Sequence, residues 1–264
     1  MPEAPTVAAV VARLRAAGCV FAEDEARLLI EAAGSPAELE ELVSRRVAGE
    51  PLEPLLGWVE FGGLRLRVES GVFVPRRRTE LLARRAAALA ADRIRTHGRA
   101  VVVDLCCGVG AIGAVVASLA PGADVYEADL DPAAVRCARL NLPAGRVFEG
   151  DLFSALPSEL GGRVDVLAVN APYVPTEAIA LMPPEARDHE PALALDGGAD
   201  GLDFHRHIAA EATDWLAPGG SLLIEAGAEQ ADVSAALFVA EGLAAHVESD
   251  DELGSTVVIA VSPP

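Results

Sequence analysis

The sequence predicts an α/β fold in which a doubly wound, mostly parallel β-sheet lies between layers of helices. From Arg99 onward, short apolar runs alternate with helix-like segments, as expected when parallel strands are joined by crossover helices. A turn containing Gly108 and Gly110 follows the first of these apolar runs. The last two runs, 244–248 and 256–261, have no helical segment between them, so an antiparallel pair is expected at the end of the chain.

The composition indicates a sizeable core and a strongly acidic protein. The chain has 264 residues, of which 52% are hydrophobic, and its formal net charge is -19. That charge opposes a broad phosphate-binding surface, because nucleic-acid-binding proteins normally carry a basic face. Neither a secretory signal nor an apolar run of about 18 residues is visible in the sequence. We therefore expect a cytoplasmic monomer that binds no membrane, with its four cysteines as free thiols.

Three segments of different character are expected along the chain. Residues 1–50 carry apolar side chains at helical spacing, which predicts a small helical N-terminal module. In residues 51–74, Gly62-Gly63 joins two extended segments, and such a dipeptide between strands is a hairpin signal. This stretch is therefore predicted to be a linker β-hairpin. Residues 75–264 are expected to form the main domain.

The strands of the main domain are predicted from apolar runs bounded by turns, and its helices from apolar residues at helical spacing. Strands are expected at 100–105, 124–128, 146–149, 164–169, 221–225, 244–248 and 256–261. Helices are expected at 79–93, 111–119, 131–140, 203–216 and 230–241. The segment Pro218-Gly219-Gly220 is predicted to be a turn between the fourth of these helices and the strand that follows it.

The turn after the first strand indicates a nucleoside-binding site. Gly108 and Gly110 allow the backbone to approach a ligand closely. Asp129 follows 19 residues after Gly110, at a strand end where an acidic side chain can accept hydrogen bonds from a ribose diol. Cys106 stands where a dinucleotide-binding fingerprint has its first glycine, and no Gly-Lys-Ser/Thr follows. The pattern therefore fits a nucleoside without a pyrophosphate better than NAD.

Asp151 and Leu152, which follow the third strand, are expected near the same crevice. The Asp151 carboxylate is placed to accept a hydrogen bond from an exocyclic amine, and Leu152 to pack on a purine face. The alternative is that Asp151 caps the next helix. Arg76-Arg77-Arg78 is interpreted as a solvated or helix-start cluster, or else as a grip on an acidic substrate loop.

The fourth strand is followed by Asn170-Ala171-Pro172-Tyr173. Asparagine has both donors and acceptors to satisfy, and proline cannot continue a central strand, so these residues are unusual choices for a core. Ligands bind at the carboxyl ends of the strands in open α/β sheets. On its own, the motif is either a strand cap with a turn or part of a ligand site.

Taken together, these residues resemble the HemK/PrmC-type protein-(glutamine-N5) methyltransferases, a family of class I S-adenosylmethionine-dependent methyltransferases. The match runs from about Arg45 to the C-terminus. The family has Asn-Pro-Pro-Tyr where this chain has Asn170-Ala171-Pro172-Tyr173. The segments that carry the resemblance are Gly49–Leu52, Leu56–Gly57, Glu60–Phe61, Phe73–Glu80, Asp104–Gly110, Asp129, Asp151–Phe153, Asn170–Tyr173 and Glu190–Leu202.

The resemblance implies a seven-stranded Rossmann-like methyltransferase sheet with an antiparallel C-terminal strand over residues 75–264. It also implies S-adenosyl-L-methionine as the cofactor and no metal. We interpret Cys106 and Cys107 as small buried thiols in the cofactor loop, not as a disulfide or a metal site. The residues that the resemblance assigns to cofactor binding are Phe73, Pro75, Asp104, Cys106, Cys107, Gly108, Val109, Gly110, Asp129, Leu130, Asp151, Leu152 and Asn170.

By the same resemblance, the chain transfers a methyl group to the side-chain amide nitrogen (N5) of a glutamine in a protein substrate, with a peptide chain release factor as the candidate. The residues assigned to catalysis are Asn170, Ala171, Pro172 and Tyr173. The Asn170 side chain and the Ala171 carbonyl would accept the two amide N–H groups, which aligns the nitrogen and stabilises the positive charge that develops on it. Tyr173 would stack on the flat amide.

Two departures from the family bear on these expectations. Ala171 replaces a proline but keeps the carbonyl, and Pro172 after it favours an extended backbone, so we expect activity to be retained. The helical module before the linker is shorter than is usual in the family, which leaves open a paralogue with another protein substrate.

Two further functions are weighed against this one. An N6-adenine methyltransferase acting on DNA or RNA would use the same motif, because an exocyclic amine also presents two N–H groups. The net charge of -19 argues against direct nucleic-acid binding. A cofactor-binding scaffold without catalysis is opposed by the presence of Asn170 and Tyr173.

Overall fold

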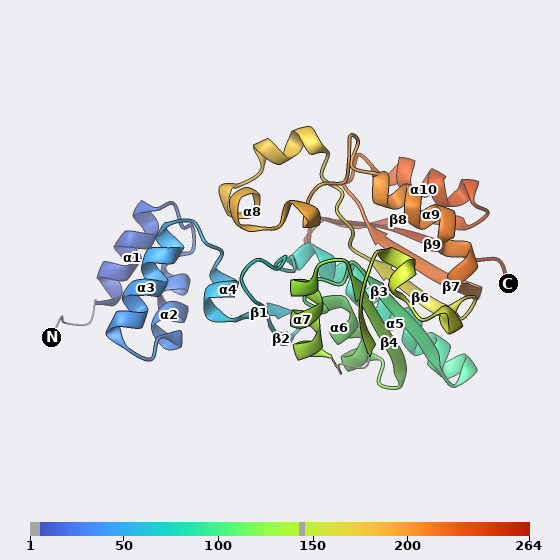
Figure 1. Cartoon of the computed structure of the whole chain (residues 1–264), viewed down its shortest axis with the longest axis horizontal. Coiled ribbons are helices and arrows are strands. Elements are labelled where there is room, and N and C mark those ends of the chain that lie inside the picture. Colours follow the sequence, from blue (N-terminus) through green and yellow to red (C-terminus); the bar gives the residue numbers. More distant parts are fainter. Residues whose placement is uncertain (1–5, 143–145) are drawn as a thin grey trace.

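The main body of the protein is a seven-stranded sheet with helices on both faces (Figure 1). The computed structural model describes residues 6–142 and 146–264. The strands of this sheet are β3 (Ala100–Leu105), β4 (Ala123–Asp129), β5 (Val147–Glu149), β6 (Val164–Val169), β7 (Leu216–Glu225), β8 (Ala244–Asp250) and β9 (Ser255–Val261). Their order is β5-β4-β3-β6-β7-β9-β8, with β9 antiparallel to both of its neighbours. The predicted fold, with its antiparallel C-terminal strand, is confirmed.

Helices cover both faces of the sheet because its central strands are apolar on both faces. On β6, Val166 and Ala168 pack in one core, which includes residues of α5, α6 and α7, whereas Leu167 and Val169 pack in the other core, which includes residues of α9 and α10. These helices are α5 (Glu80–His97), α6 (Ala111–Leu119), α7 (Pro132–Asn141), α9 (Asp203–Trp215) and α10 (Ala231–Ala240). The two layers hold the carboxyl ends of the strands in fixed positions.

The predicted turn at Pro218–Gly220 is wrong, because this segment lies inside β7. β6 pairs with β7 at Val164↔Leu216 and again at Val166↔Ser221. Because β7 has more residues than β6 between these two pairs, its extra residues form a bulge in the sheet. The C-terminal tail pairs with the bulge: the Gly219 N–H donates to Pro263, and the Gly220 carbonyl accepts from Ser262. The segment continues the strand because a distant part of the chain supplies its backbone partners.

The N-terminal helices form a separate bundle (Figure 1). They are α1 (Val7–Ala16), α2 (Ala22–Ala32) and α3 (Pro36–Val47), followed by the short α4 (Leu52–Leu56), which the sequence did not predict. The hairpin of β1 (Trp58–Phe61) and β2 (Leu64–Arg67) was predicted, and its Phe61 packs in the core of the main sheet. On this basis we propose a division of the chain into residues 1–50, 51–74 and 75–264.

Arg46 of α3 joins the helical bundle to a segment above the main sheet. Its guanidinium donates to Glu25 of α2 at 2.6 Å and also pairs with Glu185. Glu185 belongs to α8 (Pro184–His189), which lies above the linker in Figure 1. The Arg46 side chain is 9% exposed and that of Glu185 48%, so a partly solvent-exposed ion pair links the bundle to α8.

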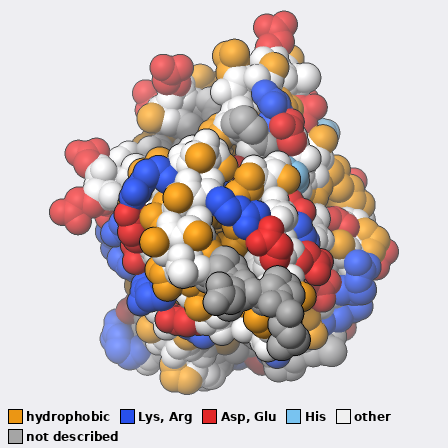
Figure 2. All heavy atoms as spheres, turned by 90° about the vertical axis from the view of Figure 1, so that its left-hand side faces the viewer, with side chains coloured by type: hydrophobic (Ala, Val, Ile, Leu, Met, Phe, Trp, Pro, Cys, Tyr) orange, Lys and Arg blue, Asp and Glu red, His pale blue; other side chains and the backbone are white. Residues whose placement is uncertain are grey.

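The surface at the bundle end shows no broad basic area (Figure 2). All 21 basic residues of the chain are arginines, and on this face their side chains alternate with acidic ones. In the part of the chain that the structure describes, no helix is long and apolar enough to cross a membrane.

Ser35 is expected to stabilise the bundle as the N-cap of α3. Its hydroxyl accepts from the Glu38 N–H at 3.2 Å, and the Glu38 carboxylate accepts from the Gly34 N–H at 2.7 Å. The Ser35→Ala variant should lose about 1 kcal/mol of unfolding free energy, because the Glu38 N–H loses its acceptor. Urea unfolding measures this. Ser35→Asp keeps an acceptor and should unfold like the wild type, and equal losses in both variants would contradict the capping role.

Candidate active site

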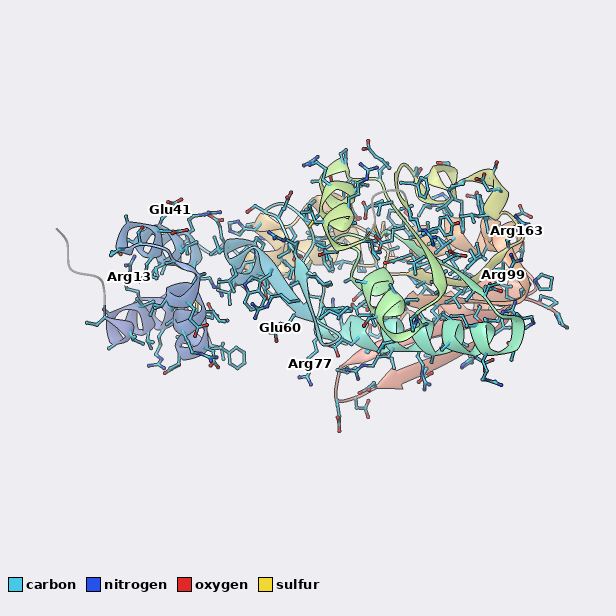
Figure 3. All side chains as sticks on the ribbon, turned by 90° about the horizontal axis from the view of Figure 1, so that it is seen from below. Arg13, Glu41, Glu60, Arg77, Arg99 and Arg163 are labelled. Carbon is cyan, nitrogen blue, oxygen red and sulfur yellow. The ribbon has the colours of Figure 1, made fainter. Side chains whose placement is uncertain are left out.

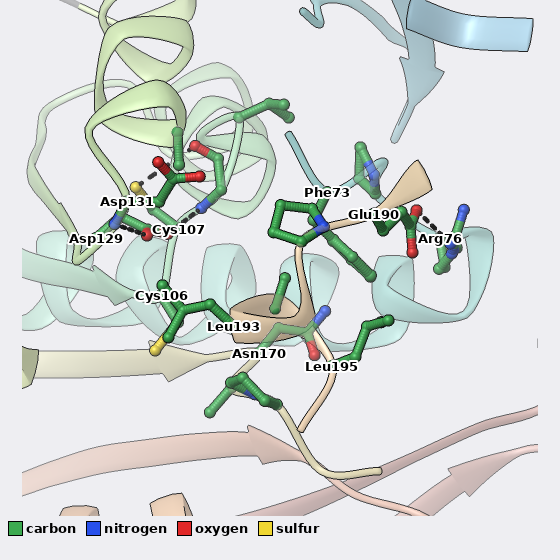
Figure 4. Close-up of a pocket in the computed structure, with 18 of the residues that line it drawn as sticks. Phe73, Arg76, Cys106, Cys107, Asp129, Asp131, Asn170, Glu190, Leu193 and Leu195 are labelled. Carbon is green, nitrogen blue, oxygen red and sulfur yellow. Dashed lines mark hydrogen bonds and ion pairs between the residues drawn. The ribbon is translucent and has the colours of Figure 1, made fainter. Parts of the chain in front are cut away.

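A cavity of about 390 Å³ opens at the carboxyl ends of the central strands, within the range of small-molecule sites. Figure 4 shows Cys106, Asp129 and Asn170, which stand at or just after the ends of β3, β4 and β6, around this cavity. The lining includes most of the predicted site residues: Phe73, Pro75, Cys106, Cys107, Gly108, Val109, Asp129, Leu130, Asp151, Leu152, Asn170, Ala171, Pro172 and Tyr173. The strand ends thus bring together residues that are far apart in the sequence.

Two of the predicted cofactor residues, Asp104 and Gly110, are not in the lining. Asp104 is fully buried, and its Oδ2 accepts from the Gly113 N–H at 3.0 Å. Gly110 is the N-cap of α6. Both lie behind the loop that lines the cavity, so we propose that they support this loop and do not touch the cofactor.

Strained backbone marks two positions in the cavity wall. Cys106 has a φ of 57° and Leu152 a φ of 42°. They are the two residues other than glycine with positive φ in 6–142 and 146–264, and both line the cavity. This conformation costs about 1–2 kcal/mol for a residue with a side chain, and such strain concentrates at functional sites.

The Asp129 carboxylate is fixed by the backbone around it. Its Oδ2 accepts from the Gly108 N–H at 2.8 Å and its Oδ1 from the Asp131 N–H at 2.9 Å. Burial raises the pKa of Asp129, while these hydrogen bonds oppose the rise. Each oxygen keeps a second lone pair, so a carboxylate in this position can accept from the two hydroxyls of a ribose.

Asp151 and Asn170 are two further polar residues of the lining. The Asp151 side chain is exposed and makes no hydrogen bond that caps the following 3-10 helix η3 (Leu152–Ala155), so the capping alternative fails. The Asn170 Nδ2 donates to the Thr79 hydroxyl at 3.2 Å. Thr79 also lines the cavity, and with Nδ2 bonded to it the Asn170 amide oxygen can accept a hydrogen bond from a ligand.

Tyr173 is held by Glu225, a residue that the sequence did not single out. The phenol donates to Glu225 Oε1 at 2.9 Å, and the Arg78 Nε donates to the same oxygen at 3.2 Å. Burial and the nearby Glu225 carboxylate raise the pKa of Tyr173, so the phenol stays protonated and remains a donor. The ring is thereby fixed as a wall of the cavity. Its only trace in the sequence is an acidic residue at the end of a predicted strand, which does not indicate Tyr173 as the partner.

Arg76-Arg77-Arg78 lies at a helix start, as predicted, since η1 (Arg77–Thr79) leads into α5, but Arg76 and Arg78 are in addition paired with buried carboxylates. Arg76 pairs with Glu190, and Arg78 with Glu225, and each carboxylate is only 2% exposed. Buried carboxylates draw the two guanidinium groups onto the cavity wall, because an unpaired buried charge is costly. Arg77 is exposed and points away from the body of the protein (Figure 3).

Gly110 is expected to be essential for the shape of the cofactor loop. Its φ is 77°, and a Cβ there would lie 2.8 Å from both Glu127 carboxylate oxygens. Gly98, which ends α5 with a φ of 79°, has nothing within 4 Å of such a Cβ. Gly98→Ala should therefore cost only the backbone strain of about 1–2 kcal/mol. Gly110→Ala should in addition weaken cofactor binding about tenfold or more.

Calorimetric titration with S-adenosylmethionine would test this pair of variants. The two glycines share their backbone conformation, so the comparison separates the general cost of backbone strain from the effect of crowding Glu127 at the cofactor loop. Equal affinities in Gly98→Ala and Gly110→Ala would contradict the prediction.

Comparison with known proteins agrees with this geometry. The methyltransferase small domain family matches residues 64–182. A release factor glutamine methyltransferase from Geobacter sulfurreducens is 37% identical over 83% of this chain and 75% of its own length. A 4-amino-L-phenylalanine/4-methylamino-L-phenylalanine methyltransferase from Streptomyces pristinaespiralis is 40% identical over 78% of this chain and 71% of its own.

A crystal structure of a methyltransferase from Pyrococcus furiosus superposes with a TM-score of 0.54 and 17% identity, covering 76% of this chain and 90% of that one. At this identity, the match supports the fold alone. The two sequence relatives identify the family, because the similarity extends over most of this chain and most of each relative. The protein is an S-adenosylmethionine-dependent methyltransferase, and it belongs to the release factor glutamine methyltransferase family.

Proposed function

We propose that the protein methylates the side-chain amide nitrogen of a glutamine in a protein substrate, with a release factor as the first candidate. The observation that carries this proposal is Asn170, which lines the cavity just after β6 and whose side-chain amide has an oxygen that can accept a hydrogen bond. An acceptor in this place suits a substrate nitrogen that presents N–H groups. The relative from Geobacter sulfurreducens, named for this activity, supports the choice of glutamine.

The cavity has a suitable set of residues for the cofactor. S-Adenosylmethionine supplies an electrophilic methyl group on a sulfonium centre. Asp129 is the residue that would hold the ribose, since backbone N–H groups fix it beside the loop at Gly108. Asp151 and Leu152, at the edge of the cavity, would contact the base.

The residues that follow β6 would prepare the substrate nitrogen. An amide nitrogen is a weak nucleophile because its lone pair is delocalised. Acceptors at the Asn170 oxygen and the Ala171 carbonyl would orient the nitrogen and stabilise the positive charge that it gains. The methylated nitrogen then loses a proton readily, so no strong general base is required. Tyr173, held by Glu225, supplies a flat wall.

A free aromatic amine is a second candidate substrate, since one relative at 40% identity is named for 4-amino-L-phenylalanine. A free amino acid has a carboxylate that needs a cation. Arg76 and Arg78 line the cavity, but both already pair with buried carboxylates. A neutral side chain presented by a protein loop therefore fits this wall better. We propose further that the protein acts as a cytoplasmic monomer without binding nucleic acid.

The substrate classes can be separated in one experiment. Purified protein is incubated with S-adenosylmethionine carrying a labelled methyl group and, in parallel, with unmethylated release factor, 4-amino-L-phenylalanine or a DNA or RNA oligomer. Mass spectrometry then locates the label. Label on a glutamine of the release factor is the expected result. Label on the aromatic amine or on adenine, with the release factor unlabelled, would replace the proposal with the corresponding alternative.

A further inference from the structure

Gln230 connects three segments of backbone behind the loop that follows β6. It is the N-cap residue of α10, and its Nε2 donates to the carbonyls of Tyr173 at 3.0 Å and Asp200 at 2.8 Å. Its Oε1 accepts from the Gly227 N–H at 3.1 Å. A backbone carbonyl can only accept a hydrogen bond and a backbone N–H can only donate one. These three partners therefore fix the orientation of the Gln230 amide.

The backbone is closely packed around the Tyr173 carbonyl. A Cβ added to Gly201 would lie 2.2 Å from this carbonyl oxygen, and one added to Gly197 would lie 2.8 Å from the Tyr173 Cα. The loop after β6 therefore lies directly against residues 197–201. Because the Gln230 amide bonds to both segments, it holds them together at this contact.

Asn141 makes the same kind of connection behind the cofactor loop. It is the last residue of α7, and its Nδ2 donates to the carbonyls of Arg67 at 3.0 Å and Val109 at 2.8 Å. Its Oδ1 accepts from the Arg67 N–H at 2.8 Å. Val109 lines the cavity, and Arg67 ends β2. This amide therefore joins the cofactor loop to the linker hairpin.

We propose that these two amides have separate positioning roles, Gln230 for the substrate nitrogen and Asn141 for the cofactor. Neither side chain is in the lining of the cavity, so each acts through backbone. Gln230 acts through the loop that carries Asn170 and Tyr173, and Asn141 acts through Val109. The effect of Gln230 on turnover rests on the proposed function, whereas the effect of Asn141 on cofactor binding does not.

The two roles are expected to be independent because the amides lie on opposite faces of the sheet. Residues of α7 pack in the core that includes α5 and α6, whereas residues of α10 pack in the core that includes α9. Loss of one connection should therefore leave the other loop in place.

Replacing each amide by the acid of the same shape removes its donors. In Gln230→Glu and Asn141→Asp, carboxylate oxygens would face backbone carbonyls, so both connections should open. The two variants add the same charge, which makes each of them the control for the other. If an acid variant does not unfold cooperatively in urea, Gln230→Met or Asn141→Leu takes its place, since these side chains lack donors and add no charge.

Gln230→Glu should lower the single-turnover rate on the release factor about tenfold or more, because a small displacement of the acceptors misaligns the substrate nitrogen. Its affinity for S-adenosylmethionine, measured by calorimetric titration, should stay within about twofold of the wild type. Asn141→Asp should show the opposite pattern, with about tenfold weaker cofactor binding and a rate at saturating cofactor within about threefold of the wild type. Equal losses of rate and affinity in both variants, or the reversed pattern, would overturn the proposal.

The backbone contact of Gln230 can be followed without any substrate. The chain contains two tyrosines, Tyr126 and Tyr173, so tyrosine labelled with ¹³C at the carbonyl carbon gives two NMR signals, which Tyr126→Phe assigns. The Tyr173 signal should move upfield in Gln230→Glu, because its carbonyl loses a donor, and should stay in place in Asn141→Asp. An unmoved Tyr173 signal in Gln230→Glu would overturn the proposal.

Failure of the proposed function gives a different result from failure of this inference. If the wild type does not methylate the release factor, the proposed function fails. The Tyr173 carbonyl signal and the cofactor titrations then still decide whether Gln230 and Asn141 each hold their own loop.

Discussion

Asn170→Ala is expected to lower kcat for methyl transfer to glutamine by about 10²–10³-fold. The variant loses an acceptor that aligns the substrate nitrogen and stabilises its developing charge, and in a cavity of limited size water is a poor replacement. Asn170 follows β6, whereas the Asp129 carboxylate belongs to β4 and is held by its own backbone contacts. Binding of S-adenosylmethionine should therefore change little.

Single-turnover kinetics and calorimetric titration would measure these two effects separately. Asn170→Asp retains acceptors in the same place and should keep a much larger share of the rate than the alanine variant. A rate for Asn170→Ala within tenfold of the wild type would remove Asn170 from the catalytic role. A parallel loss of cofactor affinity would make it a cofactor-binding residue.

Much of the sheet could be predicted from the sequence because its central strands are buried on both faces. Residues 100–105 and 164–169 are uninterrupted apolar runs apart from one aspartate each, and the structure has strands over the same residues. The helix at 111–119 was also predicted with its observed limits. The bulge at Pro218–Gly220 was not predictable, since its hydrogen-bond partners come from Ser262 and Pro263.

The candidate site also contains residues that the sequence could predict and residues that it could not. Asp129, Asp151 and the Asn170 motif could be proposed because each follows a predicted strand, and strand ends meet at one edge of the sheet. Thr79 and Glu225 could not, because their meaning depends on contacts with Asn170 and Tyr173. A hydroxyl at a helix start or an acid at a strand end has no distinctive pattern until its partner is known.

A buried pair of carboxylates beneath the cofactor loop was likewise invisible in the sequence. Asp104 and Glu127 are register partners on β3 and β4, and neither is exposed. Within the described residues, both Glu127 oxygens and the Asp104 Oδ1 lack a hydrogen-bond partner. Burial, together with repulsion from a neighbouring carboxylate, raises both pKa values, that of Asp104 to about 8. Two such groups are expected to hold at least one proton near neutral pH.

Because of this proton, the free energy of unfolding should decrease as the pH rises. The unfolded chain releases it near pH 4, whereas the native pair keeps it to higher pH. Between about pH 4 and 8 the native state therefore binds more protons, and the free energy of unfolding falls by up to about 1.4 kcal/mol per pH unit for each proton. The stabilising contribution is complete below this range and is lost as the pH rises through the native pKa.

Glu127→Gln should remove most of this dependence and make the protein more stable than the wild type at pH 8. The glutamine has nearly the same shape, carries no charge, and can donate to the Asp104 Oδ1, which lacks a partner among the described residues. Urea unfolding at pH 5, 6, 7 and 8 would measure the two slopes, with Glu229→Gln at an exposed position as the control. Since the control should follow the wild type, parallel curves for all three proteins would mean that titration of Glu127 does not cause the pH dependence.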